Sequence, residues 1–331
     1  MQRGWILVAA SLMGCVEYEF SSSGEAFGEN NPYGLNTPVE TDRVRQVTSP
    51  AVDVLWVVDN SCSMAEEQAA LGQNFREFMN YFLDTNLDYH IGVVSTDMDD
   101  YLHRGILRNS PEGRWIHPDT EAPLNNFREM TDLGVKGSAD EQGRAATYAA
   151  LELRKEEENA GFLRDEATLH VVLVSDEDDY SGNSPIGLEP FVDYLKELKA
   201  DPEMVTFSSI VGPPGGCGGG FLEMVEEGRD YIHVTQEVGG SLHSICTDDW
   251  SAILDDLGEQ AARVRVEYFL TQLPVPGTIE VEVITESGNY FFEEDGDWTY
   301  DATRNSVTFV EFIPPPLAEV FVTYEVLSST Y

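Results

Sequence analysis

Five short apolar runs are the feature that most limits how this chain of 331 residues can fold. The runs lie at Val52–Val58, Tyr89–Ser95, Leu169–Ser175, Met204–Val211 and Tyr231–Val234. Hydrophobic residues at helical spacing occupy Met64–Leu83, Glu141–Glu158, Leu188–Lys199 and Trp250–Arg263. A strand that is apolar along its whole length is buried on both faces, and strands that alternate with helices build a parallel sheet. The pattern predicts an α/β fold, with a doubly wound, mostly parallel sheet flanked by helices and a short antiparallel edge strand within Asp97–Lys136.

The pattern changes from Val264 onward, where apolar and polar residues alternate. The alternating positions include Val264, Val266 and Tyr268, then Ile279, Val281 and Val283, and finally Val320, Val322, Tyr324 and Val326. Short alternating strands separated by turns predict a small all-β, immunoglobulin-like sandwich domain. The aromatic residues of this domain are Tyr290, Phe291, Phe292, Trp298 and Tyr300. We expect them to pack in the core or on a sheet. The alternative is that they point outward and form a recognition face.

The first residues have the character of a targeting segment. A basic start at Arg3 precedes an apolar core at Trp5–Met13, which is too short to remain as a membrane span. The following Leu12-Met13-Gly14-Cys15 resembles the lipobox of bacterial lipoproteins. The resemblance implies that residues 1–14 are a lipoprotein signal peptide and that Cys15 carries the lipid. An ordinary secretory peptide is the alternative.

The residues after Cys15 predict how the chain is organised and where it resides. Residues 15–49 are rich in Ser, Gly, Asn, Pro and Glu, which predicts a lipid-anchored flexible tether. The domains expected after it are 50–263 for the α/β part and 264–331 for the all-β part. Because Val16 follows the cysteine, the lipoprotein resemblance implies the outer membrane of a bacterial cell envelope, on either its periplasmic or its surface-exposed face.

Acidic residues dominate the charge of this protein. The chain has sixty Asp and Glu residues and nineteen Lys and Arg residues, which gives a formal net charge of −41. Such a field repels nucleic acid and anionic lipid, so neither is an expected partner, and membrane contact is expected only through the lipid anchor. Adaptation to a salty environment, where ions screen the self-repulsion, is a hypothesis that this charge supports.

The remaining three cysteines are expected to have different roles. In an exported chain, Cys217 and Cys246 are expected to form a disulfide, which the chain-entropy account values at about 3 to 4 kcal/mol. Cys62 is left over, and we expect it to be a small buried hydrophobic residue that points into the core. A redox role for Cys62 is the alternative.

A group of polar side chains follows the first apolar run directly. Asp59, Ser61 and Ser63 lie in the loop at the carboxyl end of this expected strand, where open α/β sheets bind their ligands. A carboxylate and two hydroxyls are hard oxygen donors, which suit Mg²⁺, Mn²⁺ or Ca²⁺. The alternative is a polar turn, because Asp, Asn and Ser also favour turns for their local hydrogen bonds.

The run Asp59-Asn60-Ser61-Cys62-Ser63 resembles the metal-ion-dependent adhesion site (MIDAS) of von Willebrand factor type A (vWA) domains. Ser138 lies before Gly143, as a hydroxyl does in that family, and Asp176 closes a later apolar run. The resemblance covers roughly Val52 to Ala262. It implies a vWA-like fold and a divalent cation, Mg²⁺ first with Ca²⁺ or Mn²⁺ as alternatives. The implied metal ligands are Asp59, Ser61, Ser63, Ser138 and Asp176.

Further carboxylates are expected at the same edge of the sheet. They follow the second and third apolar runs and are Asp97, Asp99, Asp178 and Asp179. An auxiliary cation site is one interpretation. An acidic rim that only concentrates cations near the main site is the other.

The function implied by the resemblance is adhesion. With two carboxylates among five ligands, the cation keeps positive character, so an acidic group of a protein or glycan ligand can complete its shell. The sequence therefore predicts a membrane-tethered, metal-dependent binding module and not an enzyme. A structural scaffold of an envelope assembly with a purely stabilising cation is the alternative, and a metal-assisted hydrolase is a further one. The oligomeric state stays open.

Overall fold

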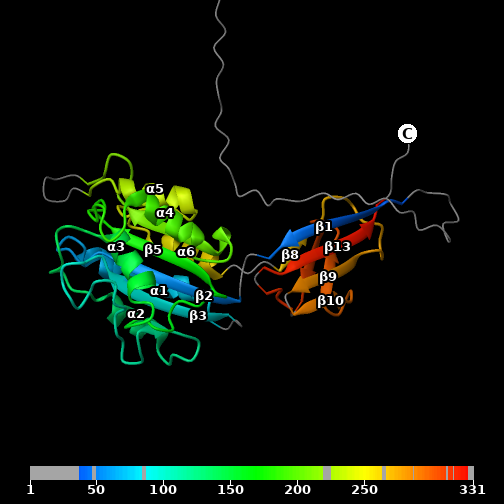
Figure 1. Ribbon diagram of the computed structural model, residues 1–331, viewed down its shortest axis with the longest axis horizontal. Helices are drawn as coiled ribbons and strands as arrows, with labels where there is room; N and C mark the ends of the chain where they lie inside the picture. Colours follow the sequence, from blue (N-terminus) through cyan, green and yellow to red (C-terminus); the bar gives the residue numbers. More distant parts are fainter. Residues whose placement is uncertain are drawn as a thin grey trace, which may run out of the picture. The chain divides into compact units, whose positions relative to one another are not determined.

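The computed structural model describes residues 37–46, 50–83, 87–218, 225–262, 266–285, 287–310, 312–315 and 317–326. The chain divides into two compact units (Figure 1). One unit, called here the α/β unit, is Val47–Val264. The other, the β unit, combines the chain before Val47 with Arg265–Tyr331. The predicted signal peptide, Cys15 and the tether up to residue 36 lie outside the described residues.

A mixed sheet forms the centre of the α/β unit, and its strands run in the order β4-β3-β2-β5-β6-β7. The strands are β2 (Ala51–Val58), β3 (Asp88–Ser95), β4 (Trp115–Ile116), β5 (Thr168–Ser175), β6 (Val205–Val211) and β7 (Leu242–Ser244). Neighbours are parallel except β3 and β4, which are antiparallel. The predicted fold class and the antiparallel edge strand within Asp97–Lys136 are therefore confirmed.

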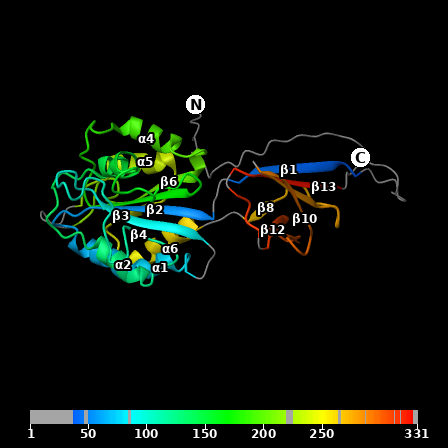
Figure 2. The same cartoon turned by 60° about the horizontal axis from the view of Figure 1, so that its bottom comes forward.

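Helices cover both faces of this sheet (Figure 2). One face carries α1 (Ala65–Met79), α2 (Pro123–Thr131) and α6 (Trp250–Ala262). The other carries α3 (Gly143–Tyr148) with its π-helical continuation Ala149–Leu153, α4 (Leu188–Glu197) and α5 (Arg229–Val238); a 3₁₀ turn at Pro202–Met204 precedes β6. Side chains of strand β2 point alternately to the two faces of the sheet. Trp56 packs on one face in a cluster with Phe75 and Phe127, and Leu55 packs on the other in a cluster with Phe191. Among the described helices, none is both long and apolar enough to cross a bilayer.

One predicted strand is wrong. Tyr231–Val234 belongs to helix α5, in which Tyr231, Val234 and Thr235 are buried at helical spacing. Gly239, with φ of 91°, ends this helix, as glycine commonly does. Hydrophobic periodicity does not separate a four-residue strand from one buried turn of helix, which explains the error.

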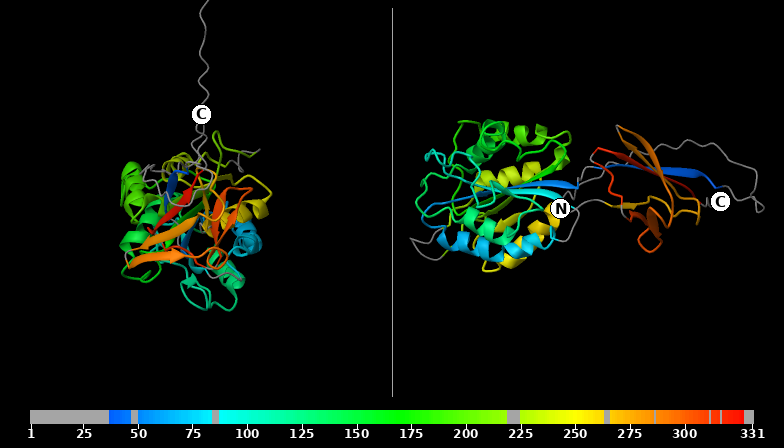
Figure 3. Two further views of the ribbon diagram at one scale, coloured as in Figure 1. Left: turned by 90° about the vertical axis from the view of Figure 1, so that its right-hand side faces the viewer. Right: turned by 90° about the horizontal axis from the view of Figure 1, so that it is seen from below.

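The β unit is a sandwich of two antiparallel sheets (Figure 3). One sheet has the order β1-β13-β9-β10, formed by Val39–Arg45, Glu319–Glu325, Glu280–Thr285 and Gly288–Phe292. The other has the order β11-β12-β8, formed by Trp298–Asp301, Ser306–Phe309 and Glu267–Phe269. Both sheets contribute to one buried cluster that includes Trp298, Val307 and Val320. The predicted all-β architecture is confirmed.

Strand β1 is a correction to the predicted tether. Val39–Arg45 pairs with β13 along its whole length, so a flexible tether does not extend to residue 49. Val44 is buried in the sandwich, and the buried Asp42 accepts hydrogen bonds from Thr271 and the Tyr324 hydroxyl. The strand was not predicted because the segment is mostly polar, which obscures the alternation of buried and exposed residues. The α/β unit is consequently inserted into the β unit, between β1 and β8.

The aromatic residues of the β unit divide between core and surface. Trp298 is buried in the sandwich, as expected. Phe291 in β10 is instead 75% exposed, and Tyr290 beside it is 45% exposed. The expectation of core packing is therefore wrong for these two side chains.

Candidate metal-binding site

The candidate site lies where the strand order reverses. Strand β2 is flanked by β3, which follows it in the chain, and by β5, which follows only after α3. Loops leaving β2 and β5 therefore diverge to opposite faces and open a crevice between them, the usual ligand position in such sheets. Asp59 follows β2 and Asp176 follows β5 at this point.

Asp59 is fully buried and held by two donors. Its Oδ1 accepts a hydrogen bond from the Ser61 backbone N–H at 2.7 Å, and its Oδ2 accepts one from the Ser175 hydroxyl at 2.7 Å. Burial, together with the negative charge of Asp176, raises the pKa of Asp59 to about 6. The carboxylate is thus fixed in orientation but short of compensating positive charge.

Three further predicted ligands meet at Asp59. The hydroxyls of Ser61 and Ser63 are 3.0 Å apart, and the Asp176 side chain lies beside those of Ser63 and Asp59. Burial raises the pKa of Asp176, which is 8% exposed. The structure therefore brings Asp59, Ser61, Ser63 and Asp176 together.

Ser138 differs from the other predicted ligands. Its hydroxyl donates a hydrogen bond to Asp99 Oδ2 at 2.9 Å and also accepts one from the Asp140 backbone N–H. Ser138 therefore helps to hold the loop between β3 and β4. Within the described part of the chain, the hydrogen bonds of the Ser138 side chain do not involve Asp59, Ser61, Ser63 or Asp176.

Glu141 is a residue at the site that the sequence prediction missed. It is fully buried, accepts a hydrogen bond from the Thr96 hydroxyl and contacts the Asp59 side chain. Burial and the charge of Asp59 raise the pKa of Glu141 to about 9. Its place two residues before Gly143, where α3 begins, was visible in the sequence. The search for a hydroxyl ligand in that segment passed over a carboxylate.

Other acidic groups surround this centre. Burial and the charges of Asp59 and Asp176 raise the pKa of Glu177 to about 7. Burial also raises the pKa of the half-buried Glu67, with the Asp176 charge as a further cause. Negative groups are thus concentrated at one edge of the sheet at the cost of mutual repulsion, which a bound cation would relieve.

The donor set fits a hard cation. Three buried carboxylate oxygens around Asp59 have no hydrogen-bond partner: Asp176 Oδ1, Glu141 Oε1 and Glu67 Oε2. Buried polar atoms normally have a partner, so these oxygens are places where a cation would be stabilising. Among the described residues, no three or more His, Cys, Asp or Glu side chains already stand in position to hold an ion. The hydroxyls of Ser61 and Ser63 are two further oxygen atoms at this centre.

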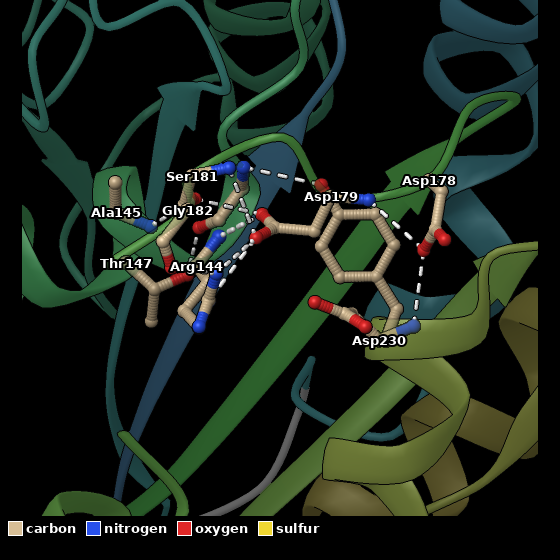
Figure 4. A network of polar contacts seen from close by, with 10 residues as sticks. Arg144, Ala145, Thr147, Asp178, Asp179, Ser181, Gly182 and Asp230 are labelled. Atoms are coloured by element: carbon tan, nitrogen blue, oxygen red, sulfur yellow. Dashed lines mark hydrogen bonds and ion pairs between the residues drawn. The ribbon is translucent and has the colours of Figure 1, made fainter. Parts of the chain in front are cut away.

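Two carboxylates of the expected auxiliary site, Asp178 and Asp179, are engaged in other contacts (Figure 4). Asp179 accepts hydrogen bonds from the Arg144 backbone N–H and Nε, both at 3.0 Å, in a buried ion pair. Asp178 accepts from the Asp230 backbone N–H at the start of α5 and from Arg229 Nε. Both carboxylates therefore join the loop after β5 to helices α3 and α5.

The other two auxiliary candidates also stabilise a loop. Asp97 Oδ1 accepts hydrogen bonds from the backbone N–H groups of Asp99 and Asp100, at 2.8 and 3.0 Å. Asp99 in turn accepts from Ser138. The structure gathers Asp97 and Asp99 in one loop and Asp178 and Asp179 in another, and each of the four has a hydrogen-bonding role of its own.

Cys62 is exposed, so the expectation that it points into the core is wrong. Met64, two residues later, is fully buried and occupies the core instead. The prediction failed because the loop turns between Ser61, which is buried, and Ser63, which is exposed. The expected disulfide between Cys217 and Cys246 is present.

Two cavities adjoin the site. A cavity of about 410 Å³ is lined in part by Asn60, Asp97, His103 and Lys136, and one of about 740 Å³ lies between α1 and α2. Gly134 and Val135 line both cavities. The surface beside the candidate cation site is thus concave, with charged groups in its walls, as ligand-binding surfaces commonly are.

Comparisons with known proteins give resemblance in structure only. No family description and no curated protein matches the chain. A von Willebrand factor type A structure from Catenulispora acidiphila is 14% identical, with a TM-score of 0.41 over 88% of this chain and 62% of that one. Proximal thread matrix protein 1 from the mussel byssus, with a zinc-occupied MIDAS motif, is 17% identical, with a TM-score of 0.41 over 67% of this chain and 48% of that one.

The pilus adhesin SpaC from Lactobacillus rhamnosus GG is 13% identical, with a TM-score of 0.41 over 90% of this chain and 41% of that one. The chain thus spans less than two thirds of the length of each of these structures. At this level of similarity the assignment of the site rests on the geometry described above.

Proposed function

We propose that the α/β unit is a cation-dependent binding module of the vWA type. The observation that supports this most is the meeting of Asp59, Ser61, Ser63 and Asp176 at the point where the strand order reverses. Asp176 Oδ1 is buried there without a hydrogen-bond partner. Two carboxylates and two hydroxyls would hold the ion, with Mg²⁺, Ca²⁺ and Mn²⁺ as the candidates.

The residues around the site prepare it for binding. Ser175 and the Ser61 backbone fix the Asp59 carboxylate, while the exposed Ser63 keeps the site open to solvent. The cation, when bound, supplies a positive charge that an oxygen atom of the partner approaches. A protein or acidic glycan would dock over the concave surface beside Asn60 and Lys136, and binding would depend on the metal.

The location and the non-enzymatic role belong to the same proposal. Lipid attachment at Cys15 would hold the protein on the bacterial cell envelope, at the outer membrane. We propose a binding role in preference to metal-assisted hydrolysis, because an ion held by Asp59, Ser63 and Asp176 beside a concave surface is sufficient to bind an oxygen atom of a partner.

Calorimetric titration of Mg²⁺, Ca²⁺ and Mn²⁺ into the purified protein tests the proposal. Saturable binding is expected in the wild type and in Asp165→Ala, a matched control because Asp165 is 97% exposed. Binding should be lost in Asp59→Ala and weakened in Ser63→Ala, whose exposed side chain can be removed without affecting folding. Equal titration curves for all four proteins would refute a site at Asp59.

A stabilising cation without a binding role is the second candidate. It is favoured by the burial of Asp59 and Asp176, since an ion among buried carboxylates also stabilises the loops that carry them. Chelation distinguishes the two candidates. A protein that stays folded after chelation, in circular dichroism, supports the binding module, whereas loss of the α/β fold supports the scaffold.

A further inference from the structure

Glu141 has the features of a metal ligand that neither the sequence prediction nor the resemblance assigned. Its side chain is fully buried, it contacts Asp59, and its Oε1 atom has no hydrogen-bond partner. A buried carboxylate oxygen without a donor is costly, and most native structures provide a partner. A cation beside Asp59 would satisfy this oxygen.

The backbone around Glu141 fixes it at this position. The Tyr180 backbone N–H donates to the Glu141 carbonyl at 2.7 Å, and the Gln142 N–H donates to the Thr96 carbonyl at 3.2 Å. These bonds attach the segment to the loops after β5 and β3 respectively. Thr96 also donates its hydroxyl to Glu141 Oε2, which leaves Oε1 as the free atom.

Unlike Glu141 Oε1, the Ser138 hydroxyl already has hydrogen-bond partners, and they lie away from Asp59. Its hydroxyl both donates and accepts in the loop near Asp99, and it is only half-buried. The family resemblance placed a hydroxyl ligand on Ser138, but the structure places a carboxylate, three residues later, against Asp59.

We infer that Glu141, in place of Ser138, is a ligand of the cation and the third carboxylate around it, beside Asp59 and Asp176, and that an acidic group of a partner has to compete with it. This inference rests on the proposed function. In the part of the chain that the structure describes, no three carboxylates already stand around one point, and binding would draw Glu141 Oε1 toward the ion. Three carboxylates would outweigh a divalent charge, and the resulting oxygen-rich shell suits Ca²⁺, which accepts six to eight oxygens, better than Mg²⁺.

Titration of Ca²⁺ and of Mg²⁺ into wild type, Glu141→Gln and Ser138→Ala tests the ligand assignment. Glu141→Gln keeps the shape and removes the charge, so Ca²⁺ affinity should fall by about tenfold or more. The wild-type preference for Ca²⁺ over Mg²⁺ should shrink with it. Ser138→Ala should bind like the wild type. Unchanged affinity in Glu141→Gln with weakened binding in Ser138→Ala would overturn the inference.

Competition is tested with acetate as a carboxylate probe on the Ca²⁺-loaded proteins. Loaded Glu141→Gln should bind acetate more tightly than the loaded wild type, because the internal competitor is gone; equal affinity would overturn this part of the inference. Thermal unfolding without metal checks that the variant folds, and Glu141→Asp provides a second variant that keeps the charge but shortens the reach. If the wild type binds no cation at all, the proposed function itself fails.

Discussion

At the scale of single residues, Asp59 and Glu141 make the metal-free protein sensitive to pH. Burial raises the pKa of Asp59 from 3.8 to about 6 and that of Glu141 from 4.5 to about 9. An acid with a raised pKa binds its proton more tightly in the folded protein than in the unfolded chain. The folded state is therefore favoured at low pH, and this advantage disappears as pH rises through the folded pKa.

We expect the free energy of unfolding of the chelated protein to fall as the pH rises from about 4.5 toward 9. Glu141→Gln should flatten this dependence, because the amide does not titrate. Urea unfolding at several pH values, with a chelator present, measures the effect. A metal-free wild type that became more stable over the same range would contradict the assigned burial of these carboxylates.

Two neighbouring residues in the loop after β2 should respond differently to substitution. Cys62→Ser should change stability by less than about 0.5 kcal/mol, because Cys62 is exposed. Met64→Ala should cost about 2 to 5 kcal/mol, because Met64 is fully buried among core residues. Denaturant unfolding measures both values, and rapid labelling of Cys62 by a thiol reagent in the native protein checks its exposure.

At the scale of elements, Gly143 explains how α3 can start so close to the sheet. A Cβ atom there would lie against Leu173 of β5 and within 2.7 Å of the Tyr231 hydroxyl of α5. That hydroxyl also accepts a hydrogen bond from the Gly143 N–H at 3.1 Å. The glycine lets the chain that carries Glu141 pass between β5 and α5.

Gly143→Ala should therefore destabilise the α/β unit by about 1 to 3 kcal/mol, the usual cost of overpacking. Gly296→Ala in the β unit is a suitable control, since its added Cβ would meet only one atom, at 3.9 Å. Thermal unfolding compares the two variants. Equal melting temperatures would show that the approach of β5 and α5 to this turn is looser than described.

The loop after β5 depends on a buried ion pair. Removing the carboxylate in Asp179→Ala leaves the Arg144 guanidinium buried without its partner, which should cost about 3 to 5 kcal/mol. Cation stoichiometry should stay unchanged, because Asp179 already has partners of its own. If calorimetry instead showed that the variant binds one cation fewer per protein, Asp179 would be a ligand of an auxiliary cation site.

The elements show which parts of the architecture were predictable. Strands β2 and β5 were found because runs such as Leu169–Ser175 are apolar on both faces, and Asp59 and Asp176 follow from where these strands end. The segment Tyr231–Val234 was misassigned because one buried turn of helix has the same composition. Glu141 could not be found by spacing alone. Its role depends on a contact with Asp59, which lies 82 residues earlier in the sequence. Only the folded sheet brings these two side chains together.

At the scale of the whole molecule, the insertion of the α/β unit makes the β unit depend on both ends of the chain. Strand β1 pairs with β13, and Val44 contributes to the same buried cluster as Val320. Val44→Asp should therefore cost about 3 kcal/mol or more in the β unit, since it buries an unpaired charge. In hydrogen exchange, the backbone amides of β9 and β13 should lose protection in this variant, while those of β2 and β5 should keep theirs. Glu40→Gln, in the same strand as Val44, is the control.

The insertion also has a consequence for the order of folding. Strand β1 is synthesised first, but roughly 220 residues separate its end from β8, and closing so long a loop is entropically costly. Val52 and Ala261, near the two ends of the α/β unit, lie in one apolar cluster, so folding of that unit brings its own termini together. The open loop then shrinks to a few residues, which lowers the closure cost by roughly 3 kcal/mol. Strand β1 remains without its partner strand β13 until the rest of the chain has been synthesised, so we expect the sandwich to form after the α/β unit.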